Sequence, residues 1–246
     1  MVGRWSEFQR RPLRNFTAPE LGILLQRGFG EQAERMSDGA THIVYVHGLW
    51  MNGTESLFLR RRLRSQVGVP THAFRYRSVS AKMTDITAAL HGFVQELAPK
   101  SLHLIAHSLG GLVVYRFLER YPDTPPGRVV FLGVPLVASR AAVSVSARLR
   151  WAPLGRSVAD ELLTPQQRPW PAGRELGVIA GTRPMGLGRF FAGYDEDYDG
   201  TVAVSETRVP GATDFISLPV SHSGMMLSAR VAREAGAFFK NGRFGL

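Results

Sequence analysis

A short stretch near the middle of the chain, residues 101–112, changes its hydrophobic pattern at a single serine. Leu102, Leu104 and Ile105 form an apolar run typical of a strand covered on both faces, whereas the apolar residues after Ser108 return at helical spacing. A serine at such a turn projects its hydroxyl from the top of the sheet, at the N-terminus of the following helix. The stretch therefore predicts a strand, a sharp turn and a helix, with Ser108 as a candidate nucleophile.

The turn around Ser108 needs small residues on both sides, because the chain two residues before it and two residues after it must pass close together. Ala106 and Gly110 occupy these positions. Glycine is the more usual residue at the first of them, and a methyl group is the least bulk that can replace it. Taken alone, Ser108 also suits a plain helix cap, since serine is a good N-cap residue. Its partners elsewhere in the chain must decide between the two interpretations.

Segments with strand and helix patterns alternate along most of the 246 residues and predict one α/β domain. Strands are expected at residues 41–46, 69–76, 101–107, 128–134, 176–180 and 214–218, and helices at 54–67, 83–97, after 108 and at 223–240. This alternation implies a mostly parallel sheet of about six strands with helices on both faces. Pockets in such sheets open at the carboxyl ends of the strands.

Two stretches fall outside the alternation. Residues 1–38 are polar and basic, and Pro19 suits the first turn of a helix, so an N-terminal helical extension is expected. Residues 137–174 carry spaced apolar side chains among arginines and prolines, and they are too long for a plain connection. We expect a cap or lid over the pocket here, while an ordinary excursion with one packed helix stays open as an alternative.

Composition excludes several classes of site and partner. The formal net charge of +10 comes mostly from arginine, but the charges are scattered and lack the interleaved aromatic residues of a single-strand binder. We therefore expect no nucleic-acid partner and leave a weak contact with a membrane surface open. The absence of cysteine excludes disulfides, thiolate metal sites and a cysteine nucleophile. No apolar stretch is long enough for a signal-peptide core or a spanning helix, so a cytoplasmic protein is expected.

A serine hydroxyl needs a base at neutral pH, and the base needs a third group to orient it. His222 lies in the loop between the last predicted strand and the last predicted helix, and we expect it to be the base. The acid is expected in the loop after the strand at 176–180, where Asp199 directly precedes a Gly-Thr-Val sequence and Asp197 is the second choice. The order serine, aspartate, histidine is the one expected for this architecture.

The same acidic loop also fits the pattern of a calcium-binding loop, with spaced acids, a central glycine and a closing glutamate. The residues concerned are Asp195, Asp197, Asp199, Gly200 and Glu206. The flanking sequence argues against a helix-loop-helix calcium site. The residues before the loop are rich in glycine, and the Pro-Gly pair at 210–211 prevents a long helix after it. No metal ion and no other cofactor is therefore expected, although calcium in this loop stays open.

The oxyanion that forms when Ser108 attacks an acyl carbon needs preorganised donors, normally two backbone N–H groups. Leu109 supplies one of them from the N-terminus of the helix. The other is expected from the loop after the first strand, where Gly48 allows close approach of the backbone and Leu49 follows it. His47 is expected to orient this loop and to take no part in the chemistry.

These motifs resemble the lipase and esterase branch of the α/β-hydrolase family, and the alanine in the turn is similar to that of some small bacterial lipases. The matching motifs are residues 46–48, 106–111, 199–202 and 222–225. The resemblance covers about residues 41–239 and implies the α/β-hydrolase fold, with Ser108 as nucleophile and Asp199 and His222 completing the triad. It also implies that Leu49 and Leu109 donate the oxyanion hydrogen bonds. The sheet is expected to lack the leading hairpin of the family.

We accordingly expect a serine carboxylester hydrolase that works through an acyl-enzyme on a small-molecule acyl ester. Trp50 and Met51, beside the oxyanion loop, are expected to contact substrate and, with the apolar cap residues, favour an acyl chain over a sugar or a peptide. An acyltransferase or a thioesterase would use the same residues, and a non-catalytic binding protein on this scaffold is the alternative of another class. The choice between lipase and esterase, the natural substrate and the oligomeric state stay open.

Overall fold

The computed structural model of the chain describes residues 40–136, 169–171, 173–185 and 195–246. The expected N-terminal extension and most of the expected cap, residues 137–168, lie outside the described residues. The chain divides into two units, residues 1–38 and 39–246. The description below concerns the second unit.

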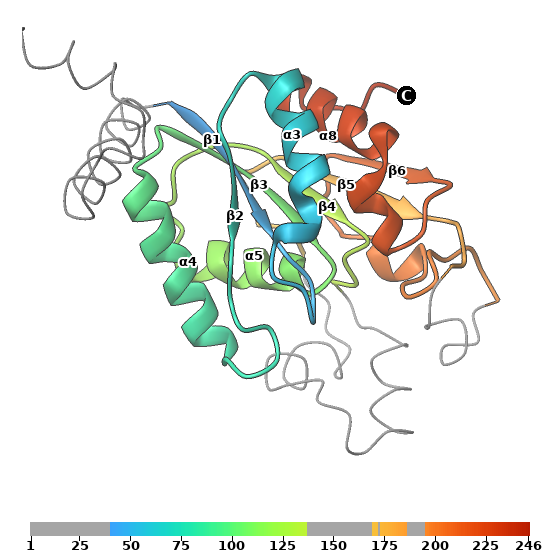
Figure 1. Cartoon of the computed structure of the whole chain (residues 1–246), viewed down its shortest axis with the longest axis horizontal. Helices are drawn as coiled ribbons and strands as arrows, with labels where there is room; N and C mark the ends of the chain where they lie inside the picture. The colour runs from blue at the N-terminus through green and yellow to red at the C-terminus, as the bar shows by residue number, and fades with distance from the viewer. Residues whose placement is uncertain (1–39, 137–168, 172, 186–194) are drawn as a thin grey trace, which may run out of the picture. The chain divides into compact units, whose positions relative to one another are not determined.

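Six parallel strands form a single sheet in the order β2-β1-β3-β4-β5-β6 (Figure 1). The strands are β1 (Thr41–Val46), β2 (Thr71–Phe74), β3 (Ser101–His107), β4 (Val129–Leu132), β5 (Leu176–Gly181) and β6 (Asp214–Leu218). The chain adds β2 on one side of β1 and then returns to add β3 and all later strands on the other side. The predicted parallel α/β sheet is confirmed, and the reversal beside β1 is the place where pockets form in such sheets.

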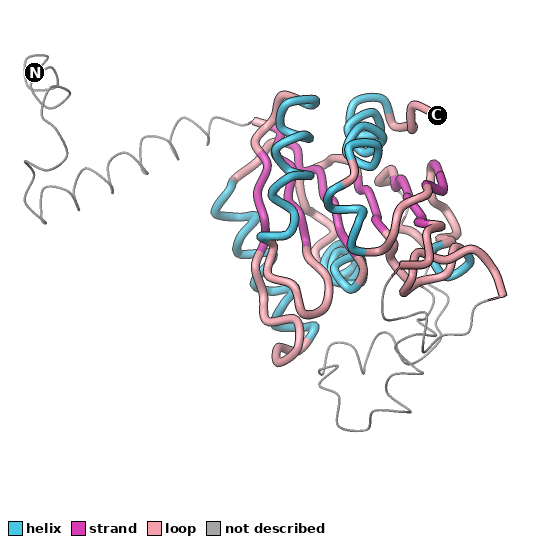
Figure 2. Tube along the Cα trace, turned by 45° about the vertical axis from the view of Figure 1, so that its right-hand side comes forward, coloured by secondary structure: helices cyan, strands magenta, loops and turns pink. Residues whose placement is uncertain are grey.

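Helices cover both faces of the sheet, as predicted (Figure 2). Helices α4 (Met83–Leu97) and α5 (Leu109–Arg120) cover one face, and α3 (Leu57–Val67) and α8 (Ala229–Asn241) cover the other. Three short 3-10 helices complete the described part: η2 (Thr54–Ser56), η4 (Ser205–Thr207) and η5 (Ser223–Leu227). Within the described ranges, no helix combines the length and the apolar character that crossing a membrane needs.

Side chains of the central strands point alternately to the two faces, and both sets are buried. Val44 and Val46 of β1 pack under α4 and α5, whereas Ile43 and Tyr45 pack under α3 and α8. Burial on both faces explains why the strand segments read as continuous apolar runs. The core therefore has two layers, one on each side of the sheet.

The bounds of several elements differ from those predicted. The predicted helix at 54–67 begins as η2 and continues as α3, and the predicted strand at 69–76 is reduced to β2. The predicted helix at 223–240 is divided into η5 and α8. The division falls at Ser228, whose extended backbone ends η5 and whose side chain accepts a hydrogen bond from the Val231 N–H. Ser228 is therefore the N-cap of α8.

Candidate active site

Ser108 lies on a sharp turn between β3 and α5, with φ 53° and ψ −126°. A positive φ is strained for a residue that carries a Cβ. Two hydrogen bonds hold the turn, from the Ser108 N–H to Leu132 O at 3.1 Å and from the Gly111 N–H to Ser108 O at 2.9 Å. The hydroxyl forms no capping hydrogen bond to α5, so Ser108 is not a side-chain cap. The residue is half-buried and lies at the carboxyl end of β3.

The start of α5 passes so close to neighbouring backbone that only glycine fits there. A Cβ on Gly110 would lie 2.3 Å from Val46 O, and one on Gly111 would lie 2.3 Å from a methyl carbon of Val134. Separations this short are not observed for real Cβ atoms. Gly110 and Gly111 therefore let the first turn of α5 lie directly against the end of β1 and against Val134.

His222 and Asp199 are in direct contact at the same edge of the sheet. The distance from His222 Nδ1 to Asp199 Oδ2 is 2.7 Å, and the His222 N–H also donates to the main-chain oxygen of Asp199 at 2.8 Å. The other carboxylate oxygen, Asp199 Oδ1, accepts from the N–H groups of Thr201 and Val202 at 2.9 and 2.8 Å. Asp199 is 1% exposed and His222 7% exposed. A carboxylate held in this way places the ring proton on Nδ1 and leaves Nε2 of His222 as a hydrogen-bond acceptor.

Asp197, the second choice for the acid, is exposed to solvent. Its main-chain oxygen accepts from the Val204 N–H at 2.9 Å. The contact with His222 therefore distinguishes Asp199 from Asp197, which the sequence alone could only rank.

Two glycines that the sequence analysis did not select make room for the Asp199–His222 pair. A Cβ on Gly133, after β4, would lie 2.9 Å from Asp199 Oδ2 and 3.1 Å from His222 Nδ1. A Cβ on Gly181, at the end of β5, would lie 2.6 Å from Asp199 Cβ. Both glycines stand at the carboxyl ends of strands, and that position is the signal that could have identified them.

His107, directly before Ser108, is another residue that the sequence analysis did not select. Its ring is fully buried and lies 4.5 Å from the ring of His222, measured between centroids. Burial holds the pKa of His107 well below its ordinary value, so the ring is neutral. His107 Nε2 lies 3.0 Å from His222 O.

The loop after β1 packs against Ser108. A Cβ on Gly48 would lie 3.1 Å from Ser108 Cβ and 3.3 Å from His107 O. Within the described part of the chain, the amides of Leu49 and Leu109 donate no hydrogen bond. The structure thus brings the loop that carries Leu49 to the serine, with both expected donor amides unused by other described residues.

His47 and Tyr76 hold this loop from behind. His47 Nδ1 lies 2.8 Å from Gly48 O, and His47 Nε2 lies 3.3 Å from the Tyr76 amide nitrogen. The Tyr76 hydroxyl donates to His47 O at 2.7 Å, and the two rings stack at 4.1 Å. Burial lowers the pKa of His47, so its neutral ring donates from Nδ1 and accepts at Nε2. These contacts support the expectation that His47 orients the loop, and they add Tyr76, which the sequence analysis missed.

Trp50 and Met51, the expected substrate contacts, follow this loop. Trp50 is 63% exposed and has a left-handed backbone, with φ 58°. Its N–H donates to Ser78 Oγ at 3.1 Å, which links the ends of β1 and β2. Met51 is half-buried and donates its N–H to Gly48 O at 3.4 Å.

No metal centre emerges among the residues that the structure describes, since they contain no group of three histidine or acidic side chains able to hold an ion. In the acidic loop, Asp199 is directed to His222, whereas Glu206 Oε2 accepts from the Ala203 N–H at 2.9 Å. These two carboxylates of the calcium pattern therefore have separate protein partners.

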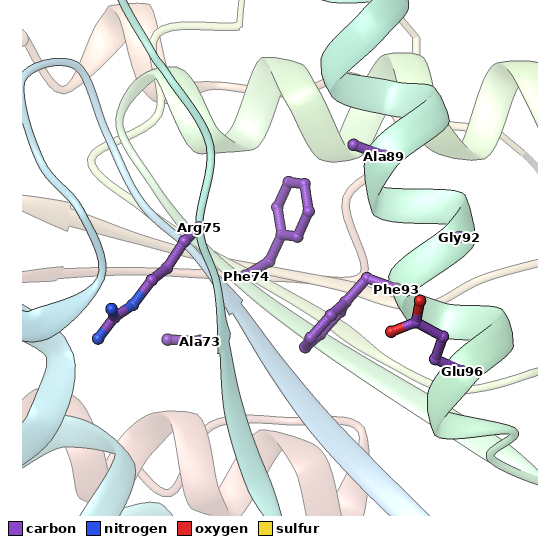
Figure 3. Close-up of a pocket in the computed structure, with 7 residues that line it drawn as sticks. All are labelled: Ala73, Phe74, Arg75, Ala89, Gly92, Phe93 and Glu96. Carbon is purple, nitrogen blue, oxygen red and sulfur yellow. The ribbon is translucent and has the colours of Figure 1, made fainter.

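A separate hollow of about 530 Å³ lies between β2 and α4 (Figure 3). Phe74 and Phe93 line it together with the charged side chains of Arg75 and Glu96. None of the residues that surround Ser108 and His222 contributes to its wall. We assign it no part in the chemistry.

Comparison with known proteins identifies the family. The model of the Alpha/beta hydrolase family matches residues 43–234, so the chain belongs to this family. The resemblance drawn from the motifs is confirmed, and the chain is a member of a family of hydrolases. No curated protein matches the chain.

Several solved structures share the fold at low sequence identity. Phospholipase PlaB from Legionella pneumophila, in complex with thio-NAD, is 22% identical, with a TM-score of 0.57 over 69% of this chain and 44% of that one. The pyrethroid hydrolase PytH is 16% identical, with a TM-score of 0.58 over 82% and 98% of the two chains. The thioesterase RedJ from Streptomyces coelicolor is 13% identical, with a TM-score of 0.54 over 81% and 86%. The chain thus spans less than half the length of the phospholipase.

Proposed function

We propose that this protein is a serine carboxylester hydrolase in which Ser108 is the nucleophile, His222 the general base and Asp199 the orienting acid. The observation that carries the proposal is the 2.7 Å contact between His222 Nδ1 and Asp199 Oδ2. The ring of His222 lies 4.5 Å, between centroids, from that of His107, the residue directly before the serine on its strained turn. Serine, aspartate and histidine in this chain order form the nucleophilic machinery of many hydrolases. Membership of the hydrolase family agrees with this chemistry.

In the first half-reaction, Ser108 Oγ attacks the acyl carbon of the ester and its proton passes to His222 Nε2. Asp199 stabilises the imidazolium through its hydrogen bond at Nδ1, since its Oδ1 is already fixed by two amides. The carbon–oxygen bond to the leaving alcohol then breaks, and His222 returns the proton to the departing oxygen. The product of this step is an acyl-enzyme on Ser108.

The tetrahedral oxyanion of each step is stabilised by the N–H groups of Leu49 and Leu109. In the second half-reaction, water attacks the acyl carbon while His222 takes a proton from it. The bond to Ser108 Oγ breaks, the carboxylic acid leaves, and the serine recovers its proton from His222. No redox change and no external proton donor is needed.

We propose a small-molecule acyl ester as the substrate, with Trp50 and Met51 beside the acyl group. Both residues follow the loop that approaches Ser108, and Trp50 offers a large exposed apolar surface there. An aromatic side chain of this kind contributes apolar contact area to a bound acyl chain. The substitution Trp50→Ala is therefore expected to raise KM for long acyl chains more than for acetate.

The deciding experiment measures hydrolysis of p-nitrophenyl esters of increasing acyl length. Ser108→Ala and Asp199→Asn are compared with Asp197→Asn, which makes the same chemical change at an exposed acid two residues away. We expect the first two to lower kcat by at least about 1,000-fold and the third to behave as wild type. Undiminished hydrolysis by Ser108→Ala would contradict the proposal.

Two further measurements separate the alternatives that use the same fold. Addition of an alcohol or thiol during turnover distinguishes hydrolysis from acyl transfer, because these nucleophiles compete with water for the acyl-enzyme. Labelling of Ser108 by a fluorophosphonate probe reports an activated serine. A wild-type protein that is not labelled would instead be a binding protein on this scaffold.

A further inference from the structure

Helices α3 and α8 carry exposed arginines with no exposed acid between them. These side chains are Arg61, Arg62, Arg64, Arg230 and Arg233, which we call the arginine surface. Helix α3 contains no acidic residue at all. The acid of α8, Glu234, is only 1% exposed, and its Oε2 accepts from the Gly245 N–H at 2.8 Å. The outward faces of both helices are therefore positively charged.

The two helices lie side by side on one face of the sheet, so their arginines belong to one surface (Figure 1). A Cβ on Gly236 of α8 would lie 2.5 Å from Gln66 Oε1 of α3, which shows how closely the helices approach. Their apolar sides, including Leu63 and Val231, share one core cluster beneath. Burial of those sides directs the arginines outward.

Most of this charge is not neutralised by the residues that the structure describes. In the described ranges, Arg61, Arg64 and Arg230 form no ion pair. Arg62 places its guanidinium 4.3 Å above the ring centroid of Phe58, and Arg233 lies 3.3 Å from Glu234 with its own side chain 64% exposed. The surface is therefore available to an anionic partner.

Two large aliphatic side chains are exposed at the end of the arginine surface that lies toward the candidate active site. Leu57, the first residue of α3, is 45% exposed, and Leu227, the last residue of η5, is 66% exposed. Helix η5 begins directly after His222. Tyr45 joins the two segments from below, since its hydroxyl lies 3.0 Å from Glu55 Oε1 and 3.2 Å from Met226 Sδ.

We propose that the arginine surface, with Leu57 and Leu227, docks the protein on a membrane that contains anionic phospholipid. Guanidinium groups bind lipid phosphates in a bidentate manner, and aliphatic side chains beside them enter the boundary between headgroups and acyl chains. A nucleic acid would use the charges but would gain nothing from the two leucines. Docking in this way would hold the loop of His222 at the bilayer. The catalytic value of that placement rests on the proposed function, in which His222 is the general base.

The test is flotation of the full chain with phosphatidylcholine vesicles, with and without phosphatidylglycerol. The variant Arg61→Glu with Arg64→Glu removes two cations of the surface and adds two anions. Its matched control, Lys82→Glu with Lys100→Glu, changes the net charge equally at exposed positions that flank α4, a helix of the opposite face. We expect the arginine variant to bind anionic vesicles about 100-fold more weakly than wild type. The affinity of the control variant for the same vesicles should fall by less than about fivefold.

A second variant tests the apolar part of the surface. Leu57→Ser with Leu227→Ser is expected to weaken vesicle binding by about tenfold or more. The dependence of binding on salt should stay as in wild type, because the charges are retained. Thermal unfolding of each variant confirms that the changes at these exposed positions leave the fold intact.

Several outcomes would overturn the proposal. These are equal binding to neutral and anionic vesicles, equal losses in the arginine variant and its control, or retention on DNA with no vesicle binding. The measurement involves no hydrolysis, so its result is independent of the esterase assay. A protein that binds anionic vesicles but cleaves no ester would contradict the proposed function and leave the docking surface supported.

Discussion

His107 donates a hydrogen bond from Nε2 to the main-chain oxygen of His222, with the two atoms 3.0 Å apart. The direction follows from chemistry, because a carbonyl oxygen can only accept and burial keeps the ring of His107 neutral. His107 Nδ1 then carries the lone pair and has no hydrogen-bond partner in the part of the chain that the structure describes. The residue before Ser108 thereby ties the serine turn to the loop of the proposed base.

We predict that His107 acts as a positioning residue, so that its loss affects kcat more than KM. His107→Leu removes the hydrogen bond and should lower kcat for a short p-nitrophenyl ester by about tenfold. His107→Gln keeps an N–H donor near the position of Nε2 and should recover most of that loss. Steady-state kinetics of both variants, with thermal unfolding as a check on folding, decide the matter. Equal kcat in the Leu variant and wild type would show that the contact has no catalytic consequence.

Tyr76 is predicted to matter through the loop that it supports. Tyr76→Phe removes the hydroxyl that donates to His47 O at 2.7 Å, while the stacked ring is retained. A looser loop places the Leu49 amide less well, so kcat should fall by about threefold to tenfold. Tyr121→Phe is the matched control, because Tyr121 stacks on His91, outside the residues that surround Ser108. A fall of the same size in the control would contradict the role assigned to Tyr76.

The fold was predictable because its signals are local. Burial of β1 and β3 on both faces produces apolar runs that mark strands, and the change of period at Ser108 marks the start of α5. The predicted bounds of β1, α4 and β6 match the structure. The division of the last helix at Ser228 was missed, since a single serine within a helical pattern does not reveal whether it acts as a cap.

The candidate site was predictable only in part. Ser108, Asp199 and His222 could be selected by their order and their positions after strands, but the choice between Asp199 and Asp197 required a distance. Gly133 and Gly181 lie against Asp199, and His107 donates a hydrogen bond to His222. In each case the two residues are far apart in sequence. Their roles depend on which strand lies beside which, and no local pattern encodes that adjacency.

Gly110 is predicted to be required for stability as well as for the turn. A Cβ on Gly110 would lie 2.3 Å from Val46 O, at the end of the central strand β1, and 2.6 Å from His47 O. These backbone atoms cannot move aside easily. Gly110→Ala should therefore lower the free energy of unfolding by about 2 kcal/mol or more. Gly92→Ala is the control: it lies within α4, where a Cβ would meet nothing within 4 Å.

The control should change stability in the opposite direction. Alanine in an open helix position raises the free energy of unfolding by about 0.5–1 kcal/mol relative to glycine. Urea unfolding of both variants measures the two effects. Stabilisation by Gly110→Ala would show that α5 and β1 are further apart than the structure places them.

The last prediction concerns the pH dependence of stability. His103 is a buried side chain whose Nδ1 accepts a hydrogen bond from the Arg128 N–H at 2.9 Å and whose ring stacks on Phe239. Burial, with the nearby charges of Arg128 and Arg174, lowers the pKa of His103 to about 4. A protonated Nδ1 could no longer accept from Arg128, which agrees with the direction of the shift.

The unfolded and folded states of the protein bind a proton at His103 in different pH ranges. In the unfolded chain His103 binds a proton once the pH falls below about 6.5, whereas in the folded protein it stays neutral down to a pH of about 4. Its contribution to stability is therefore present above pH 6.5 and is lost as the pH falls from 6.5 to 4. At pH 5 the loss should be about 2 kcal/mol. Above pH 6.5 the slope from this residue should vanish.

His103→Asn isolates this contribution, because the amide oxygen can accept from the Arg128 N–H but does not titrate. We expect wild type to lose about 2 kcal/mol more than the variant between pH 7 and pH 5, measured by urea unfolding at each pH. His72, whose pKa burial also lowers to about 4, is present in both proteins, so its effect cancels in the comparison. If the two proteins lose equal stability over this interval, His103 is already protonated in the folded state near pH 5, and its proposed burial as a neutral acceptor is wrong.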